Sequence, residues 1–297
     1  MTLTQLRTFL VIAETGSVHA AAEQLFVTQS AVSAALNALQ KSLDLRLLER
    51  DGRGLRLTEA GEIYAHHVRT ALGMLDQART AAVAEDDPEH GELRIAALTT
   101  AGEQLLPTVL AGFRSRHPHV GVRLEVGNRD RVRLLLDRHE VDLVLGGRPE
   151  PDSNVTVLAV RAHELIVVAP RKAVPDREPT RRPAQQTWLL REPGSGTRAV
   201  TESFLARLEL DAAPRTLTLG SNTAILESVA AGLGVTLISR DAVARQLSEG
   251  RLVEVPMAGT PLHRDWHLVA NRGHLPATAA MLAAHVLATG EFQAPGR

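Results

Sequence analysis

Hydrophobic and polar residues change their spacing twice along this chain of 297 residues. Residues 1–60 have the spacing of short helices joined by tight turns, and residues 59–87 have that of one long helix without proline. From Glu92 onward, short β-branched runs alternate with amphipathic segments, which is typical of an α/β sheet. The acidic segment 85–91 contains a proline and a glycine and predicts a domain boundary.

The alternating part of the chain predicts an ordered series of strands and helices. Strands are expected at 92–98, 120–126, 141–146, 163–169, 187–191, 215–219, 234–238 and 266–270. Helices are expected at 102–116, 129–139, 197–209, 221–232, 240–249 and 275–289. The polar stretch 175–186 contains three prolines and is expected to be an exposed loop.

Two helices near the N-terminus carry the first informative pattern. Ser17 is a suitable N-cap for a helix through Leu25, and Thr28 for a second helix to about Ser42. The second helix has one apolar stripe, made of Val32, Leu36, Leu39 and Leu43. Beside the stripe is an arc of polar side chains, made of Gln29, Ser30, Ser33, Asn37 and Lys41. Such side chains suit contacts with base edges and phosphates, although a solvated face of an ordinary helical hairpin has the same spacing.

Residues 47–58 predict a strand, a glycine turn and a second strand. Arg50, Arg53 and Arg56 cluster around the turn, as expected for a wing that contacts the DNA backbone or minor groove. The overall charge gives no such indication, because the net charge is −1 and residues 1–60 contain equal numbers of basic and acidic residues. DNA binding is therefore expected to depend on the local placement of these arginines.

Composition excludes several classes of protein. A hydrophobic content of 44% with 23% charged residues is that of a globular protein, and the absence of cysteine excludes disulfides, thiolate catalysis and zinc fingers. No signal peptide or membrane-spanning stretch is recognisable, so a cytoplasmic location is expected. The chain has no Gly-x-Ser-x-Gly elbow, P-loop lysine or dinucleotide-binding glycine spacing, so no enzyme, metal site or cofactor is predicted.

The long helix at 59–87 carries a heptad-like repeat of apolar residues. Its members are Tyr64, Val68, Ala71, Leu75, Ala78 and Ala82. Alternating steps of four and three residues, with small alanines in the row, favour pairing with a second copy of the chain over packing on its own domain.

Four loops at the expected carboxyl ends of strands carry polar or glycine-rich chemistry, where open α/β sheets bind ligands. They are 99–102, 127–129, 146–148 and 191–198. The last contains glycines, hydroxyls and an arginine at a helix start, which suits an anion, although a simple capped turn has the same residues. The expected contacts are Thr99, Thr100, Asn128, Arg148, Ser195, Gly196, Thr197 and Arg198. Arg148 is equally placed to pair with Glu150.

Four motifs together resemble the signature of LysR-type transcriptional regulators. They are Gln5-Leu6-Arg7 through Phe9, Ala20-Ala21-Ala22 through Leu25, Thr28-Gln29-Ser30-Ala31-Val32-Ser33, and Leu57-Thr58-Glu59-Ala60-Gly61. The resemblance implies a winged helix-turn-helix with DNA contacts at Gln29, Ser30, Ser33 and Arg53, to which the polar arc adds Asn37. It also implies a dimer through the long helix. The chain departs from the family with Ser30 in place of proline, and with Ala34 and Asn37 in place of longer polar or basic residues.

The C-terminal part resembles the effector domain of the subgroup that regulates RuBisCO operons. The motifs are the 191–198 loop, Gly220-Ser221-Asn222, residues 229–235, residues 250–253 and Arg264-Asp265-Trp266. The subgroup implies a homotetramer and a small anionic effector, either a phosphorylated metabolite or a carboxylate. A solute-binding protein of a transport system, or a DNA-binding protein without an effector, are the alternatives.

The predicted fold is therefore mixed. An all-α winged helix-turn-helix head (1–58) and a dimerisation helix (59–87) lead through a hinge (88–91) into a two-lobed α/β effector domain of periplasmic-binding-protein type (92–297). The first lobe is expected at 92–160 with 267–297, and the second at 161–266.

Overall fold

The computed structural model describes residues 1–52, 54–171, 185–208 and 213–296. Most of the loop expected at 175–186 lies outside these residues. The chain divides into two compact units, Met1–Arg79 with Arg138–Glu140, and Thr80–Asp137 with Val141–Arg297. Among the described residues, no helix combines the length and apolar character that a membrane span requires.

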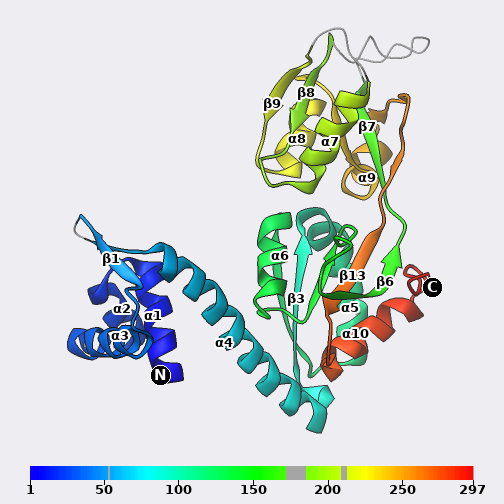
Figure 1. Ribbon diagram of the computed structural model, residues 1–297. Coiled ribbons are helices and arrows are strands. Elements are labelled where there is room, and N and C mark those ends of the chain that lie inside the picture. Colours follow the sequence, from blue (N-terminus) through cyan, green and yellow to red (C-terminus); the bar gives the residue numbers. More distant parts are fainter. Residues whose placement is uncertain (53, 172–184, 209–212, 297) are drawn as a thin grey trace. The chain divides into compact units, whose positions relative to one another are not determined.

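The N-terminal head is formed by three helices and a hairpin (Figure 1). They are α1 (Leu3–Thr15), α2 (Val18–Leu25), α3 (Gln29–Leu43), β1 (Leu48–Asp51) and β2 (Gly54–Leu57). Both predicted caps are confirmed: Ser17 Oγ accepts from the backbone N–H of Ala20 at 3.3 Å, and Thr28 Oγ1 from that of Ala31 at 3.2 Å. Thr2 and Gln5 form a capping box at the start of α1, which the sequence analysis did not identify.

Leu57-Thr58-Glu59-Ala60-Gly61 joins the hairpin to the next helix. Thr58 Oγ1 accepts from the Gly61 N–H at 3.0 Å and donates to the Arg46 carbonyl at 2.7 Å. A Cβ at Gly61 would collide with the backbone carbonyl of Leu47, so the close approach of helix and strand requires glycine here. The head core beneath this junction includes Phe9, Ile12, Leu39 and Leu47, each fully buried.

Helix α4 (Glu59–Asp86) agrees with the prediction of one long helix over 59–87. Its N-terminal part packs into the head core through Ala65, Val68 and Leu72. Farther along, Leu75 and the seam alanines at 71, 78 and 82 are exposed. These seam positions are therefore not packed against a core of the same chain.

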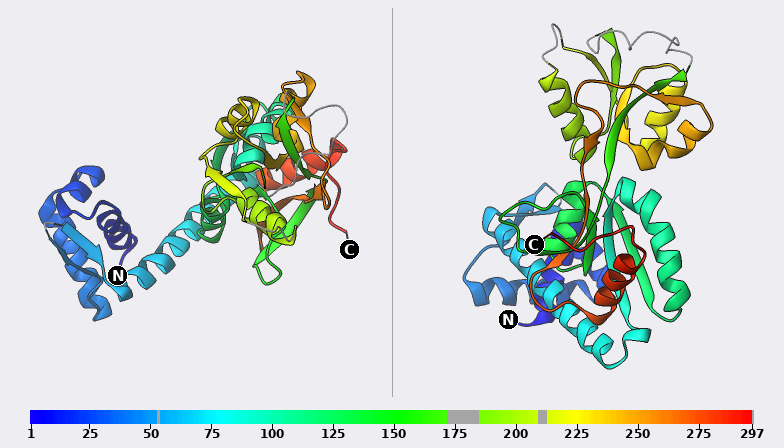
Figure 2. Two further views of the ribbon diagram at one scale, coloured as in Figure 1. Left: turned by 90° about the horizontal axis from the view of Figure 1, so that it is seen from above. Right: turned by 90° about the vertical axis from the view of Figure 1, so that its right-hand side faces the viewer.

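The second unit includes the end of α4, followed by a short 3₁₀ turn, η1 (Pro88–His90). It contains two lobes connected by two crossovers, β6 to β7 and β12 to β13 (Figures 1 and 2). The first lobe has a five-stranded sheet in the order β4-β3-β5-β13-β6. Its strands are β3 (Glu92–Leu98), β4 (Gly121–Gly127), β5 (Leu143–Gly146), β6 (Val155–Arg161) and β13 (Trp266–Asn271). The first three are parallel, and β13 runs antiparallel to both of its neighbours.

Helices cover both faces of the first-lobe sheet. On one face, α5 (Leu106–Arg116) and α10 (Ala277–Ala288) contribute Phe113 and Leu282 to a core with Ile95. On the other face, α6 (Arg129–Asp137) packs against Val144 and Val269. Alternate residues of each strand thus face different helices.

The second lobe is centred on β7, which pairs antiparallel with β10, β11 and β12, and on the parallel pair β8-β9. Its elements are β7 (Glu164–Pro170), β8 (Thr187–Leu190), α7 (Gly196–Arg207), β9 (Arg215–Thr218), α8 (Asn222–Ala230), β10 (Thr236–Ser239), α9 (Arg240–Ser248), β11 (Leu252–Glu254) and β12 (Leu262–His263). Leu165 and Val167 face the core that contains Phe204 of α7, and Ile166 and Val168 face the core under α8 and α9.

Every strand and helix predicted after residue 92 is present, with ends shifted by a few residues. The strands β6, β11 and β12 were not predicted from the sequence. The helix expected at 102–116 begins instead as a π-helical turn, η2 (Ala101–Leu105), and α5 follows it from Leu106.

Candidate functional site

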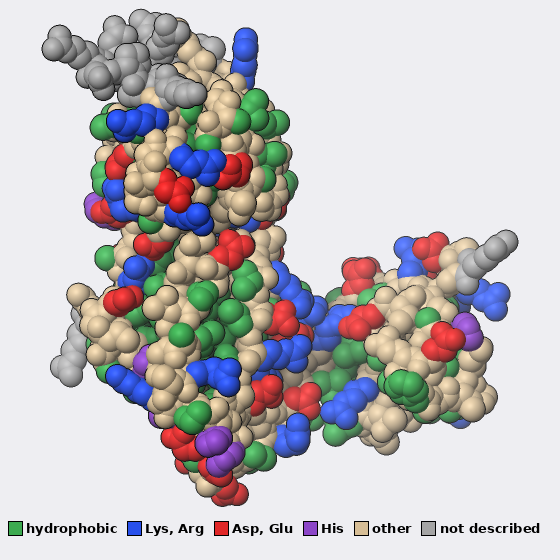
Figure 3. Space-filling view, turned by 180° about the vertical axis from the view of Figure 1, so that it is seen from behind, with side chains coloured by type: hydrophobic (Ala, Val, Ile, Leu, Met, Phe, Trp, Pro, Cys, Tyr) green, Lys and Arg blue, Asp and Glu red, His purple; other side chains and the backbone are tan. Residues whose placement is uncertain are grey.

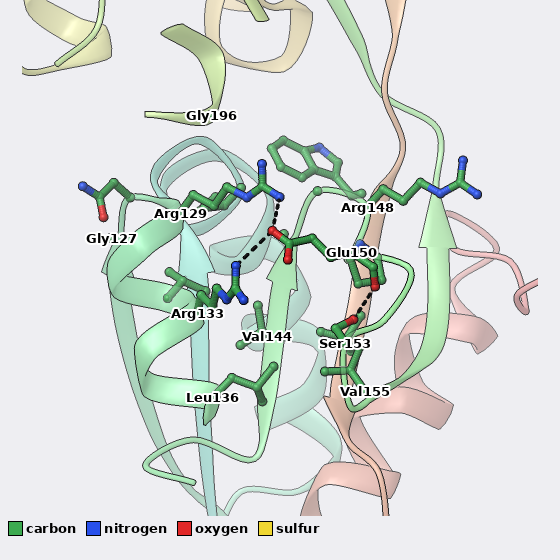
Figure 4. Close-up of a pocket in the computed structure, with 18 of the residues that line it drawn as sticks. Gly127, Arg129, Arg133, Leu136, Val144, Arg148, Glu150, Ser153, Val155 and Gly196 are labelled. Atoms are coloured by element: carbon green, nitrogen blue, oxygen red, sulfur yellow. Dashed lines mark hydrogen bonds and ion pairs between the residues drawn. The ribbon is translucent and has the colours of Figure 1, made fainter. Parts of the chain in front are cut away.

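A pocket of about 380 Å³ lies between the two lobes of the α/β unit. All four polar loops expected at strand ends contribute to its wall (Figure 4). Of the predicted contacts, it is lined by Thr99, Thr100, Asn128, Arg148, Ser195, Gly196 and Thr197. Arg198 is not in the wall.

Arg198 is bound elsewhere. Its Nε donates to Glu202 at 2.8 Å, and its Nη1 to the carbonyl of Arg191 at 3.1 Å and to Thr218 Oγ1 at 3.3 Å. Arg198 contacts Glu202 because Glu202 lies four residues later on α7, and side chains spaced i, i+4 lie on the same helix face. The role expected of Arg198 as an effector contact stays an untested prediction, and the pocket has other cations.

The start of α7 faces the pocket. Ser195 is a buried N-cap whose Oγ accepts from the Arg198 N–H at 3.5 Å. Gly194 precedes it with φ of +84°, and a Cβ there would lie 3.0 Å from Asn128 Nδ2 and from Asp130 Oδ2 of the first lobe. Glycine therefore permits both the left-handed turn and the close approach of the two lobes.

A chain of buried polar groups connects the lobes beside the pocket. Asn222 Nδ2 donates to Thr100 Oγ1 at 3.1 Å, and Arg191 Nη1 donates to Asn222 Oδ1 at 2.8 Å. Arg191 also donates twice to the carboxylate of Glu192, at 2.7 and 2.8 Å. Burial alone would raise the pKa of Glu192, but the hydrogen bonds and charge of Arg191 outweigh burial and hold that pKa below its usual value.

Two further arginines of the wall share one carboxylate. Arg133 Nη1 lies 2.9 Å and Arg129 Nη2 3.3 Å from Glu150 Oε1 (Figure 4). Arg148, for which pairing with Glu150 was the alternative, forms no ion pair with any described residue. Arg148 is exposed.

His163, Arg264 and Trp266 also line the pocket, and the sequence analysis assigned none of them to a ligand site. His163 Nδ1 lies 2.8 Å from the carbonyl oxygen of Arg264, and its Nε2 2.8 Å from Ser239 Oγ. A carbonyl only accepts, so Nδ1 carries the proton and the neutral ring accepts from the Ser239 hydroxyl. For Arg264 and Trp266 a signal was present, since Arg264-Asp265-Trp266 is one of the motifs shared with the family, whereas nothing in the sequence pointed to His163.

The polar arc of α3 is open to solvent. Gln29, Ser30 and Asn37 are exposed and Ser33 is half-buried, while Val32, Leu36 and Leu39 of the same helix are buried. Gln29 Nε2 lies 2.8 Å from His19 Nδ1 on α2. Arg53 lies outside the described residues, and Arg56, at the base of the turn, pairs with Glu49 at 2.6 Å.

Charged side chains of both signs are interspersed over the face of the α/β unit in Figure 3. No group of three or more His, Asp or Glu side chains within the described ranges is arranged to hold a metal ion. The pocket is lined by loop backbone, hydroxyl groups and arginines, which is typical of a small-molecule binding site in an α/β fold. The same chain carries a helix-turn-helix head.

The chain belongs to the LysR family of bacterial transcriptional regulators. Residues 3–62 match the family described as "Bacterial regulatory helix-turn-helix protein, lysR family", and residues 86–290 match the LysR substrate binding domain. These matches cover both the head and the α/β unit, so the chain is a DNA-binding regulator with a domain for small effector ligands.

Curated relatives and solved structures agree with this assignment. The chain is 35% identical to the HTH-type transcriptional regulator CfxR of Cupriavidus necator, over 98% of this chain and 93% of that protein. It is 35% identical to CbbR of Rhodospirillum rubrum, over 95% and 94% of the two chains. Full-length CbnR, solved in complex with its target DNA, matches with a TM-score of 0.70 at 22% identity, over 97% of this chain and 100% of that one.

A further structure is that of the regulatory domain of CcmR from Synechocystis PCC6803, in complex with 2-PG. It matches 67% of this chain and 96% of its own length, with a TM-score of 0.60 and 25% identity. The relatives are named as regulators, not as enzymes or transport proteins, so the expectation of a non-enzymatic regulator is confirmed and the solute-binding alternative is not favoured.

Proposed function

We propose that this LysR-type regulator changes its binding to DNA when a small anionic metabolite occupies the pocket between its lobes. The observation that carries the proposal is the convergence of four loops, each at the carboxyl end of a strand, on one pocket. On one side of the pocket, an anion can bind to the N-terminus of α7 and to the hydroxyls of Ser195 and Thr197. On the other side, its orientation can be fixed by Thr99, Thr100 and Asn128.

The proposed domain organisation separates DNA binding, dimerisation and effector binding along the chain. Residues 1–58 bind DNA, 59–87 form the dimerisation helix, and 88–91 form a hinge to the effector domain at 92–297. A homodimer through α4 is supported by the exposed Leu75 and its neighbouring seam alanines. A homotetramer in the cytoplasm completes the proposal.

DNA recognition is assigned to the polar arc of α3, with Gln29, Ser30, Ser33 and Asn37 contacting base edges or phosphates. Their exposure on a helix whose other face is buried supports this assignment. The wing arginine Arg53 is proposed as a contact with the DNA backbone from the sequence alone.

The chemical class of the effector is proposed from the pocket and one neighbour. The regulatory domain of CcmR was solved in complex with 2-PG, and that domain is 25% identical to this chain. A small phosphorylated acid is therefore the first candidate, and 2-phosphoglycolate is the probe.

The test measures DNA affinity by fluorescence anisotropy of the full chain, with and without 2-phosphoglycolate, on an operator obtained by selection from random duplexes. The expected result is a change in operator affinity that Thr197→Val abolishes and Thr216→Val, at an exposed residue of β9, leaves intact. A panel of anionic metabolites that neither binds nor changes operator affinity would contradict the proposed effector control.

A further inference from the structure

Three of the arginines that line the pocket already have acidic partners. Arg129 and Arg133 share Glu150, and Arg191 is bound twice by Glu192. Their charges are neutralised before any ligand arrives. For Arg148 and Arg264, no carboxylate of the described residues lies within ion-pair distance of the guanidinium group, and of these two only Arg264 is half-buried.

The surroundings of Arg264 make this lack of a partner costly. The residue lies on the crossover from β12 to β13 and is half-buried. Its guanidinium group lies over Gly147 of the third loop, where a Cβ would be 3.5 Å from Nη2. Burial lowers the pKa of Arg264 and the positive charge of Arg129 lowers it further, so its environment opposes the charge that it carries.

Two acidic residues of the pocket wall do not neutralise the charge of Arg264. Asp152 and Asp265 are exposed and form no ion pair with any described residue. Charges in contact with water are screened, whereas a half-buried guanidinium keeps much of its unfavourable desolvation energy. An anion that enters the pocket would supply the missing partner, and the planar guanidinium suits a carboxylate or phosphate.

We propose that Arg264 forms a second anion subsite, and that the effector therefore carries two acidic groups rather than one. One group binds at the N-terminus of α7, near Ser195 and Thr197, and the other binds Arg264 beside Gly147. This inference rests on the proposed function, because it takes the effector to be an anion in this pocket.

The test is a calorimetric titration of the full chain with three probes. 2-Phosphoglycolate carries two acidic groups, methyl phosphate carries only the phosphate, and glycolate carries only the carboxylate. The variants are Arg264→Gln and the control Arg245→Gln, which removes the same charge from an exposed arginine of α9 outside the pocket.

Wild-type protein is expected to bind the diacid about tenfold or more tightly than either monoacid. Arg264→Gln removes most of this advantage, so that in the variant the second acidic group of the probe adds little. Loss of a ligand group and loss of Arg264 are then non-additive, which is the signature of a direct interaction. Arg245→Gln retains the advantage of the diacid.

Folding is monitored by thermal unfolding without ligand. Arg264→Gln is expected to keep the melting temperature, because it removes an unpaired, half-buried charge. If the variant is nevertheless unstable, Arg264→Lys keeps the charge without the bidentate geometry and is expected to lose part of the advantage of the diacid.

Equal affinities of wild type and Arg264→Gln for 2-phosphoglycolate would overturn the second subsite and leave the proposed function standing. A wild type that binds methyl phosphate as tightly as the diacid would also overturn it. Failure of the wild type to bind any anionic metabolite would instead contradict the proposed function itself.

Discussion

His163 lies on the crossover from β6 to β7, which connects the two lobes. Its ring packs 4.2 Å from that of Trp266, measured between centroids, and both nitrogens are engaged, by the Arg264 carbonyl and the Ser239 hydroxyl. Burial lowers the pKa of His163, opposed by the hydrogen bond to Arg264 and the charge of Asp241 and reinforced by Arg161 and Arg264. The neutral ring is therefore the form that the folded protein prefers.

The pH dependence of stability follows from that preference. Because the folded pKa lies below the unfolded value of 6.5, the unfolded chain binds more protons as the pH falls through this window. The contribution of His163 to stability is thus complete above about pH 6.5 and decreases toward the lower folded pKa. We expect His163→Asn to reduce the fall in melting temperature between pH 7.5 and 5.5, measured by differential scanning fluorimetry.

The exposed His119 provides the control, since His119→Asn removes an imidazole that lies at the surface. It is expected to leave the pH slope as it is. His285, which is also buried with a lowered pKa caused mainly by burial, leaves some slope in the His163 variant. A slope identical to that of the wild type after His163→Asn would contradict the assignment.

Gln29 is the side chain of α3 best suited to read a base. It is exposed, and its hydrogen bond to the exposed His19 is readily exchanged for one to DNA. Gln29→Ala is expected to weaken specific binding by about 1–3 kcal/mol, because an amide forms two hydrogen bonds with adenine. Competition assays should show random DNA bound as before, and equal losses on operator and random DNA would contradict base reading.

The sequence identified most of the pocket because strand ends can be located from periodicity alone. Thr100, Asn128 and Ser195 were found in this way, and all line the wall. The pairing of Arg198 with Glu202 could also have been predicted, because the two residues are spaced i, i+4 on a helix. It was overlooked because an arginine at the start of a helix was interpreted as an anion ligand. The role of Arg264 could not be predicted in this way, because its lack of an acidic partner depends on tertiary contacts that the sequence does not show.

At the scale of elements, the three strands that were missed differ in length and were missed for different reasons. β11 and β12 are three and two residues long, too short for any period to be recognised. β6 reads Val-Thr-Val-Leu-Ala-Val-Arg and follows the turn residues Pro151-Asp152-Ser153-Asn154, so the signal for this strand was present in the sequence and was overlooked. The bounds of helix α4 were predicted to within one residue, because a long segment without proline is flanked by the Thr58 cap and by Pro88.

Leu75 tests the role assigned to α4. Its side chain is 50% exposed, and Ile63, Met74 and Val83 of the same helix are also exposed, so a second chain is the expected cover. Leu75→Asp is expected to dissociate the dimer, because a charge buried without a partner is costly. Sedimentation velocity of the full chain measures the change.

His66→Asp is the matched control for this substitution. His66 is exposed and lies nine residues earlier on α4, which at about 100° per residue is roughly the opposite side of the helix. It should leave the oligomeric state unchanged. Dissociation by both variants alike would indicate loss of the helix rather than of an interface, and dissociation by neither would contradict the seam.

At the scale of the whole molecule, two compact units have separate hydrophobic cores. The head core contains Phe9 and Leu39, and the cores of the α/β unit contain Ile95 and Trp188. Units with independent cores unfold separately unless a large interface couples them. Two ligands, DNA for one unit and the effector for the other, can therefore be used to assign the transitions.

Calorimetric scans are expected to show two unfolding transitions, each raised by a different ligand. A ligand that binds only the folded form stabilises it by about 2.7 kcal/mol at 100 times its dissociation constant. 2-Phosphoglycolate should raise the transition of the α/β unit, and selected operator DNA that of the head. Thr197→Val should remove the first shift and keep the second, since Thr197 lines the pocket and belongs to the α/β unit. One shared transition that either ligand raises as a whole would show that the units unfold together, and would contradict the independent unfolding of the two cores.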